Sequence, residues 1–295
     1  MANNCWLRMD AILGMFLFCF HWTIGQGQPL YVCPYKECVC DEAEIQCDDR
    51  NLTTIPQRDM NALIYMGILN FDGNLLTSIP AGSLPANLLS LSLDRNPLES
   101  IDDAAFDESI NTLHFLRIEG ARFTQIPAAL FRLNQLIELS IDYTHILVWD
   151  NDGMKKLGAN LRSLSMDTVG LTSWPVWLKF FSRLTDLSIF GSTISSLPDD
   201  ALDIVADTLT GLGLLNNSFT SVPKALSKLT ALTSLSLAQN KITDITWLPS
   251  LSNLTQLSLS DNRISNSSQL SAALRPYADI LSNFGHQQKL SRIHS

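Results

Sequence analysis

The sequence predicts an α/β solenoid with a curved parallel sheet on its concave side and short helices, 3-10 turns and loops on its convex side. The apolar pattern L-x-x-L-x-L-x-x-N-x-I, best formed from Leu232 to Ile242, is the first observation behind this prediction. The second is that the pattern recurs, in nine units spaced 22 to 25 residues apart. One unit of this length cannot bury its own apolar face, so consecutive units must stack.

Each unit is expected to place one short strand in the sheet. Leu235 and Leu237 alternate with Ser236, so both leucines can face inward while the serine faces out. The pattern resembles the leucine-rich repeat, and the resemblance covers residues 33–265. The leading apolar residues of the nine repeats are Met66, Leu88, Leu113, Leu136, Leu161, Leu184, Leu209, Leu232 and Leu254.

The amino terminus is a separate element. Arg8 lies in a short polar start, the residues from Ala11 to Phe20 are almost wholly apolar, and Gly25-Gln-Gly27 offers small residues for cleavage. This arrangement is typical of a secretory signal peptide cut after Gly27. A transmembrane anchor is the alternative, but the apolar run is shorter than the roughly 20 residues that a membrane span needs.

Cysteines are confined to the beginning of the chain. Two of them, Cys5 and Cys19, lie in the predicted signal peptide. The other four lie within fifteen residues of one another: Cys33, Cys38, Cys40 and Cys47. An even, clustered set in an exported protein favours two disulfides, for which the sequence allows three pairings. A zinc site is less favoured, because no histidine lies nearby and secretion favours oxidation.

This cysteine cluster resembles the amino-terminal cap of secreted extracellular leucine-rich-repeat proteins. The resemblance implies the pairs Cys33–Cys40 and Cys38–Cys47, in a flap that covers the apolar end of the first coil. In general style, without a diagnostic motif, the chain is also similar to arthropod proteins named after the non-catalytic subunit of a shrimp luciferase. Small leucine-rich proteoglycans share the cap, but this chain lacks their carboxyl-terminal cysteines.

An asparagine closes the pattern in five repeats and is replaced in the middle of the chain. The five asparagines are Asn74, Asn96, Asn217, Asn240 and Asn262. Four consecutive repeats carry other residues there: Ala121, Thr144, Val169 and Ser192. A side-chain amide can pair with backbone groups that a buried turn would leave unpaired. The interruption is therefore either ordinary drift, with water substituting, or a locally distorted arc.

Segments between the strands read as short helical turns. They run from Ala128 to Asn134, from Asp199 to Asp207 and from Pro223 to Leu229. After Ile264, a polar helix-like run extends to Tyr277, and Leu281-x-x-Phe284-x-His286 begins a tenth repeat with Lys289 at the asparagine position. This end is either a degenerate cover or, as we favour, the end of a truncated or alternatively ended product of a longer gene.

The motifs argue against an enzyme. Beyond the signal peptide there are four histidines, His114, His145, His286 and His294, and no nucleophile elbow, H-E-x-x-H motif or phosphate loop. We predict no catalytic residue, no metal site and no cofactor. The net charge of -9 disfavours nucleic acid as the partner, and no later segment is apolar enough to span a membrane.

The outward positions of the strands form the candidate binding surface. In L-x-x-L-x-L-x, the residues before, between and after the inward pair form three columns across the sheet. The second column, between the pair, is mostly small and leaves room for a ligand. The third column, after the pair, reads Asp72, Asp94, Glu119, Asp142, Asp167, Phe190, Leu215, Ala238 and Ser260.

Five acids in neighbouring strands about 5 Å apart repel one another. We predict an acidic groove for a basic protein segment, or a weak cation site, continuing into an apolar patch at Phe190 and Leu215. Arg95 and Arg117 can partly pair with Asp94 and Glu119. The alternative is a solvated acidic face with isolated exposed apolar residues. The predicted partner-binding residues are Asp72, Asp94, Arg95, Arg117, Glu119, Asp142, Tyr143, Asp167, Phe190 and Leu215.

Four N-x-S/T sequons predict glycosylation at Asn51, Asn216, Asn253 and Asn266. A glycan on Asn216 would shield the apolar patch beside it.

The sequence thus predicts a signal peptide (1–27), a cysteine-rich cap (28–56), nine leucine-rich repeats (57–265) and a degenerate or truncated end (266–295). We predict a secreted, non-enzymatic recognition module that binds a protein or peptide of basic character on its concave face. Two other functions stay open. One is a structural component of the extracellular matrix or a non-catalytic subunit of a secreted complex, and the other is a fragment of a longer receptor ectodomain.

Overall fold

A computed structural model of the chain describes residues 33–41, 44–59, 62, 67–243, 245, 247–249 and 251–277. Three predictions lie outside these residues. They are the signal peptide with its cleavage after Gly27, the position of Met66, and the tenth repeat with His286 and Lys289.

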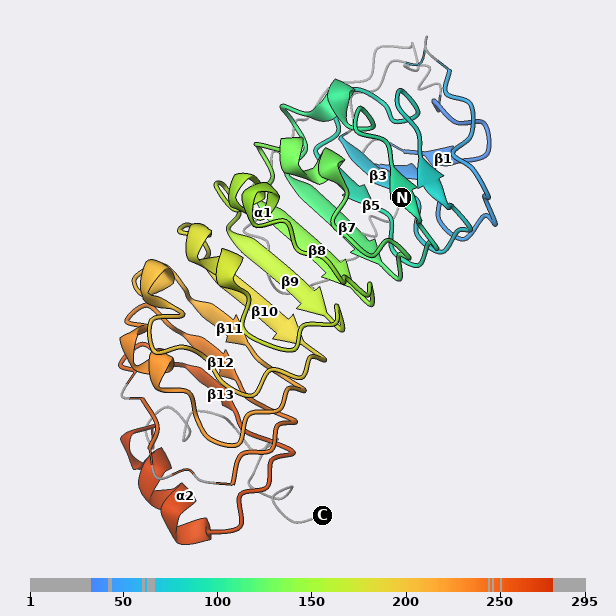
Figure 1. Cartoon of the computed structure of the whole chain (residues 1–295). Helices are drawn as coiled ribbons and strands as arrows, with labels where there is room; N and C mark the ends of the chain where they lie inside the picture. The colour runs from blue at the N-terminus through green and yellow to red at the C-terminus, as the bar shows by residue number, and fades with distance from the viewer. Residues whose placement is uncertain are drawn as a thin grey trace, which may run out of the picture. The chain divides into compact units, whose positions relative to one another are not determined.

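Eleven strands form one sheet, and their order in the sheet follows their order in the chain (Figure 1). All neighbours are parallel except the first two, which form an antiparallel pair in the cap. The predicted α/β solenoid is confirmed. The strands are β1 (Val39–Cys40), β2 (Ile45–Gln46), β3 (Ile68–Asn70), β5 (Ser90–Ser92), β7 (Phe115–Glu119), β8 (Glu138–Asp142), β9 (Ser163–Asp167), β10 (Asp186–Phe190), β11 (Gly211–Gly213), β12 (Ser234–Ser236) and β13 (Gln256–Ser258).

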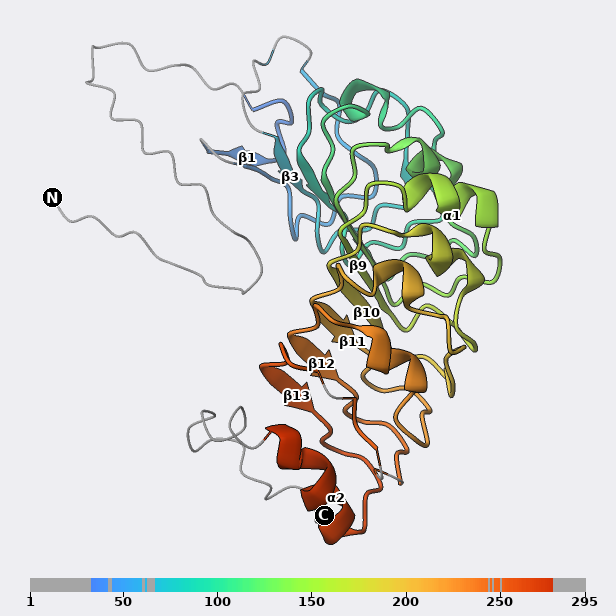
Figure 2. The same cartoon turned by 90° about the vertical axis from the view of Figure 1, so that its left-hand side faces the viewer.

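Short helices lie on the side of the coils away from the sheet (Figure 2). A second, two-stranded parallel pair joins β4 (Ser78–Ile79) and β6 (Ser100–Ile101). The predicted helical turns at 128, 199 and 223 form as 3-10 helices. The helices are η1 (Asp107–Ser109), η2 (Ala128–Arg132), α1 (Asn151–Leu157), η3 (Val176–Phe180), η4 (Asp203–Val205), η5 (Lys224–Lys228), α2 (Ser267–Leu274) and η6 (Arg275–Tyr277).

Helix α1 was not predicted. It contains Gly153 and is followed by Gly158, and glycine has a low helix propensity. Asp150 caps its start by accepting a hydrogen bond from the amide of Asp152 at 3.0 Å. Gly153 packs so closely against the ring of Phe131 that a Cβ atom would overlap it. The glycine therefore lets α1 approach η2, which outweighs its low helix propensity.

The core confirms the repeat register. Every leading leucine from Leu88 to Leu254 is at most 1 % exposed. The inward pairs from Leu91 and Leu93 to Leu235 and Leu237 are at most 2 % exposed. Because each strand buries its pair between the two flanking coils, one continuous apolar core runs along the solenoid.

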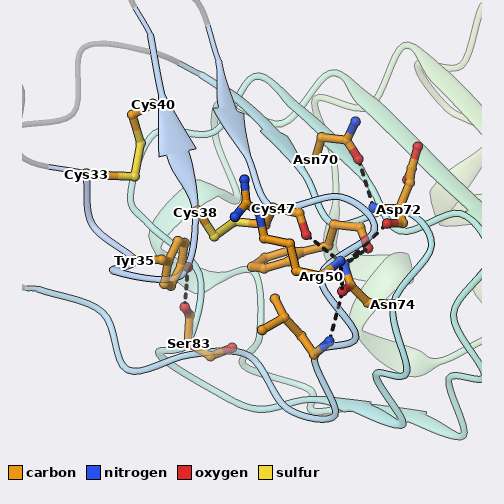
Figure 3. The surroundings of a disulfide bond; sticks show 12 residues. Cys33, Tyr35, Cys38, Cys40, Cys47, Arg50, Asn70, Asp72, Asn74 and Ser83 are labelled. Atoms are coloured by element: carbon orange, nitrogen blue, oxygen red, sulfur yellow. Dashed lines mark hydrogen bonds between the residues drawn. A yellow bond between two sulfur atoms is a disulfide. The ribbon is translucent and has the colours of Figure 1, made fainter.

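The cysteine-rich cap covers the first coil (Figure 3). Its disulfides join Cys33 to Cys40 and Cys38 to Cys47, which confirms the pairing that the resemblance implied. Tyr35 is fully buried, packs edge-on against Phe71 at 5.6 Å and donates its hydroxyl hydrogen to the carbonyl of Ser83 at 2.6 Å. This contact fastens the cap to the first two coils.

The asparagines form an amide ladder that links each coil to the preceding one. The Nδ2 atom of Asn96 donates to the carbonyls of Phe71, in the preceding coil, and Leu93, in its own. Its Oδ1 accepts from the amide of Leu76, again in the preceding coil, at 3.0 Å. Asn74, Asn240 and Asn262 bond in the same way.

Where the asparagine is missing, the strand is longer. Strands β7 to β10 have five residues each and belong to the four repeats without the amide. The five repeats that retain it have three-residue strands. In the repeats that retain it, the amide bonds the carbonyls of the two residues that follow the strand, as Asn96 does with Leu93 and Asp94 after β5. This favours a local structural change over ordinary drift.

The carboxyl-terminal end of the described chain is covered by α2. The helix was predicted from the polar run that ends at Tyr277. Asn266 caps it by accepting a hydrogen bond from the amide of Gln269 at 3.1 Å. Leu270 and Tyr277 are buried, whereas Leu257 and Leu259 of the last coil are only half-buried. The cover is thus thinner than the cysteine-rich cap at the other end.

Replacing Asn96 by alanine should lower the free energy of unfolding by about 2–4 kcal/mol. The change leaves the buried amide of Leu76 and carbonyl of Phe71 without partners. Thr144 occupies the same position in another repeat but bonds only the carbonyl of Asp142 in its own turn. Its replacement by alanine should cost about 1 kcal/mol. Equal losses for both variants in urea denaturation would contradict the ladder.

Candidate partner-binding surface

The three outward columns lie in register across the sheet. In the third column, Glu119 lies opposite Asp142, Asp142 opposite Asp167, and Asp167 opposite Phe190. The second column is small around this region, with serine at 140, 165 and 188. Strands β7 to β9 therefore carry carboxylates along one edge, beside the small serines of β8 to β10 and the exposed Arg117 of β7.

A row of left-handed residues follows the third column. In ten successive coils, the residue after the third-column position has a φ between 48° and 73°. We call it the turn row; it consists of Asp49, Gly73, Arg95, Gly120, Tyr143, Thr168, Gly191, Asn216, Gln239 and Asp261. Glycine adopts this conformation at the lowest cost. The side chains of Arg95 and Tyr143 are therefore carried at positions where the backbone itself favours glycine.

Two of the predicted acids link neighbouring coils. The Oδ1 atom of Asp72 accepts from the amide of Asp94 at 2.8 Å and from the hydroxyl of Ser92 at 2.6 Å. Asp142, three repeats later, likewise accepts a hydrogen bond from the amide of the third-column residue in the next coil, Asp167, at 2.9 Å. These two carboxylates hold the third column together, which explains part of the acidic pattern without a ligand.

Asp94 is buried rather than displayed. It is 6 % exposed and pairs with Arg117, whose Nη2 atom lies 3.1 Å from its Oδ2. Burial raises the pKa of Asp94 from 3.8 to about 6, against the opposing effect of the Arg117 charge. The predicted pairing of Arg117 is thus present, while Arg95 lies 3.7 Å from Asp49.

In the described part of the chain, three of the predicted residues in the acidic region are accessible and, unlike the half-exposed Asp72 and Asp142, accept no backbone amide hydrogen from the next coil. Tyr143 is 57 % exposed, Glu119 and Asp167 are half-exposed, and Glu119 has no side-chain hydrogen bond or ion pair within the described residues. The negative charge of Asp167 raises the pKa of Tyr143, and so does the hydrogen bond that the tyrosine hydroxyl donates to this carboxylate. An aromatic ring beside two carboxylates can attract a cationic side chain.

Two further acids enlarge this region and were missed in the sequence. Glu138 on β8 and Asp186 on β10 occupy the first column. Ser163 of β9 lies between them and pairs with both. Burial raises the pKa of Glu138, and the charge of Asp186 raises it further. Reading the first column as well as the second and third would have found them.

The predicted apolar end is only half-exposed. The ring of Phe190 packs over Gly213 of β11, so closely that a Cβ atom at this glycine would overlap it. Leu215, the next residue of the third column, is also half-buried. The four sequon asparagines, Asn51, Asn216, Asn253 and Asn266, are all exposed. A glycan on Asn216 stays a prediction, as does the apolar contact beside it.

The described residues hold no group of three or more histidine, cysteine, aspartate or glutamate side chains placed to bind a metal ion. His114 contacts the carbonyl of Thr112 through Nδ1 at 2.6 Å. Within the same residues, no helix has both the length and the apolar composition to cross a membrane.

Comparison with known proteins identifies the repeats and the cap. The family described as "Leucine rich repeat" matches residues 207–264, and the "Leucine rich repeat N-terminal domain" matches residues 32–58. Osteomodulin of Rattus norvegicus is 27 % identical over 253 residues, which are 80 % of this chain and 56 % of osteomodulin. Lumican of Oryctolagus cuniculus is 34 % identical over 26 % of this chain and 41 % of lumican. The chain thus matches little more than half the length of these relatives, or less.

Solved structures show the same fold. A leucine-rich-repeat protein of Leptospira interrogans superposes with a TM-score of 0.58 and 23 % identity, over 70 % of this chain and 52 % of that one. The octameric complex of Latrophilin 3, Unc5D and FLRT2 contains a chain that superposes with a TM-score of 0.58 and 22 % identity, over 77 % and 69 %. Leucine-rich repeats and the amino-terminal domain that accompanies them are thus both present in this chain, whose sequence is similar to osteomodulin and lumican.

The buried Asp94 should give the protein a defined pH dependence. The folded carboxyl keeps its proton up to about pH 6, whereas the unfolded one loses it near 3.8. The stability that Asp94 contributes is therefore fully present below pH 3.8 and falls as the pH rises towards 6.

The variant Asp94→Asn stays uncharged and serves as the reference. The free energy of unfolding of the wild type minus that of the variant should fall by about 2 kcal/mol between pH 4 and pH 7. Other titrating groups cancel in this difference, which urea denaturation measures. A difference that stays constant with pH would show that the Asp94 charge is not destabilised by burial.

Proposed function

We propose that this chain is a secreted, non-enzymatic recognition module that binds a basic segment of a protein or peptide on its strand face. The observation that carries the proposal is the in-register surface of β7 to β10, where Glu119, Asp167 and Tyr143 are accessible beside small second-column residues. A preformed sheet presents these groups with little ordering cost on binding.

Tyr143 is the proposed centre of this contact. Exposed tyrosines are enriched among residues that contribute most to protein interfaces. Its left-handed backbone, with a φ of 48°, costs stability that glycine would not. Binding of a partner to the tyrosine ring would offset this loss of stability.

The comparisons support a role in interactions outside the cell. The structural neighbour FLRT2 occurs in a complex with other proteins, and osteomodulin and lumican share the repeat type. A matrix component remains the second proposal, because osteomodulin aligns with most of this chain. The receptor-fragment proposal would gain support from a longer transcript that encodes a membrane segment.

A comparison of paired variants tests the strand face. The first carries Glu119→Gln and Asp167→Asn, two exchanges of nearly equal volume that remove accessible charges. The control carries Asp199→Asn and Asp200→Asn, which remove the same charge on the helix side. Partners recovered from extracellular fluid by the wild type and the control, and lost by the first variant, would support the proposal. Equal recovery by all three proteins would refute it.

The variant Tyr143→Gly separates binding from folding. Because glycine occupies this row at 73, 120 and 191, the free energy of unfolding should stay within about 1 kcal/mol of the wild type. Affinity for the recovered partner should fall at least about tenfold, measured by surface plasmon resonance. Gln239→Gly is the matched control, since it changes the same row beside Ala238, and it should leave the affinity unchanged.

A further inference from the structure

A cluster of cations lies on the helix side of the middle coils. Lys155 and Lys156 lie in the last turn of α1, Lys179 lies in the last turn of η3, and Arg183 follows in the same coil. All four side chains are exposed. We call them the basic patch. They belong to two consecutive coils, whose helices α1 and η3 are in contact.

An aromatic ring brings two of these cations together. The Nζ atom of Lys155 lies 5.4 Å from the centroid of Phe180, and the Nζ atom of Lys179 lies 5.2 Å from it. Since both distances share one centroid, the two ammonium groups are at most about 11 Å apart.

Arg183 joins the patch near the loop that follows α1. Its Nη1 atom donates to the Oδ1 atom of Asn160, in the loop after α1, at 3.1 Å. Asn160 is itself held by a hydrogen bond from its Nδ2 to the carbonyl of Asn134. The guanidinium is thus fixed near the end of the helix that carries the lysines.

No carboxylate neutralises the patch within the described residues. Arg132 and Lys228 occupy the corresponding last turns of η2 and η5, and both form ion pairs, with Asp107 at 2.7 Å and Asp203 at 2.5 Å. The four cations of the patch form none. The acids nearest the two α1 lysines along the chain are Asp150, which caps the helix, and Asp152 in its first turn. The acid nearest Arg183 is Asp186, which lies on strand β10.

Helix stabilisation does not account for the arrangement. A cation in the last turn favours the helix dipole, but α1 has only seven residues and η3 only five. Arg183 lies outside both helices. The dipole also gives no reason for two ammonium groups to converge on one ring.

We propose that the basic patch binds a sulfated polysaccharide. Sulfate groups keep their charge at every physiological pH, and ammonium and guanidinium groups bind such oxyanions through charge-assisted hydrogen bonds. An extended chain with repeated sulfates would meet cations of both coils in turn. The patch lies on the helix side and the acidic region on the strand face, so a polysaccharide and a protein partner can bind at the same time.

The test compares two triple variants with the same change in net charge. The patch variant carries Lys155→Gln, Lys156→Gln and Lys179→Gln. The control carries Lys36→Gln, Lys224→Gln and Arg263→Gln, which are exposed cations scattered over the cap, η5 and the last coil. Urea denaturation should give the same midpoint for both variants and the wild type, because all six side chains are exposed.

The probe is a heparin oligosaccharide of defined length, titrated by calorimetry at about 0.15 M salt. We expect the wild type and the control to bind it and the patch variant to bind at least about tenfold more weakly. The same oligosaccharide without its sulfates should not bind. The proposal is overturned by equal weakening in both variants, by no binding to the wild type, or by equal affinity for polyglutamate, which would indicate an acidic protein partner.

Discussion

Every coil of this protein depends on its neighbours to bury the inward leucine pair of its strand. A lone repeat would leave that pair and its leading leucine in water, so stability arises only between stacked coils. The two ends of the stack meet this constraint differently. The cap closes the first coil with two disulfides and the buried Tyr35, whereas α2 leaves Leu257 and Leu259 partly open at the last.

The same constraint shapes the binding surface. For the coils to stack, the chain must leave the sheet at the equivalent position of every repeat. A residue with a left-handed backbone makes that turn in ten successive coils. The turn fixes where the next side chain points, so the third column and the turn row run beside each other across the sheet. Tyr143 and Arg95 show that the scaffold carries large side chains there as well as glycine.

The repeat register, the two disulfides and the convex turns could be predicted because each depends on local spacing or on a family pattern. The burial of Asp94 could not, because its column position is the same as that of the more accessible Glu119. The difference comes from Arg117 on the neighbouring strand, 23 residues later in the chain. The missed acids Glu138 and Asp186 lie in the first column, which had to be read together with the other two. The basic patch needed the contact between α1 and η3, which no sequence period specifies.

The change in strand length divides the solenoid into blocks. Between β5 and β7 only three residue pairs join the strands and no asparagine reaches back, but the Arg117–Asp94 pair crosses this boundary. Between β10 and β11 there are again three pairs. The Nδ2 atom of Asn217 reaches back to the carbonyl of Ile189 at 2.8 Å, but its buried Oδ1 has no partner within the described residues. Inside the middle block, five pairs join each strand to the next. In the nearest-neighbour picture of repeat proteins, the two places where the strand length changes are candidate limits of cooperative units. Partial unfolding would therefore release whole blocks, and the middle block, which carries both the acidic region and the basic patch, would open or close as one cooperative unit.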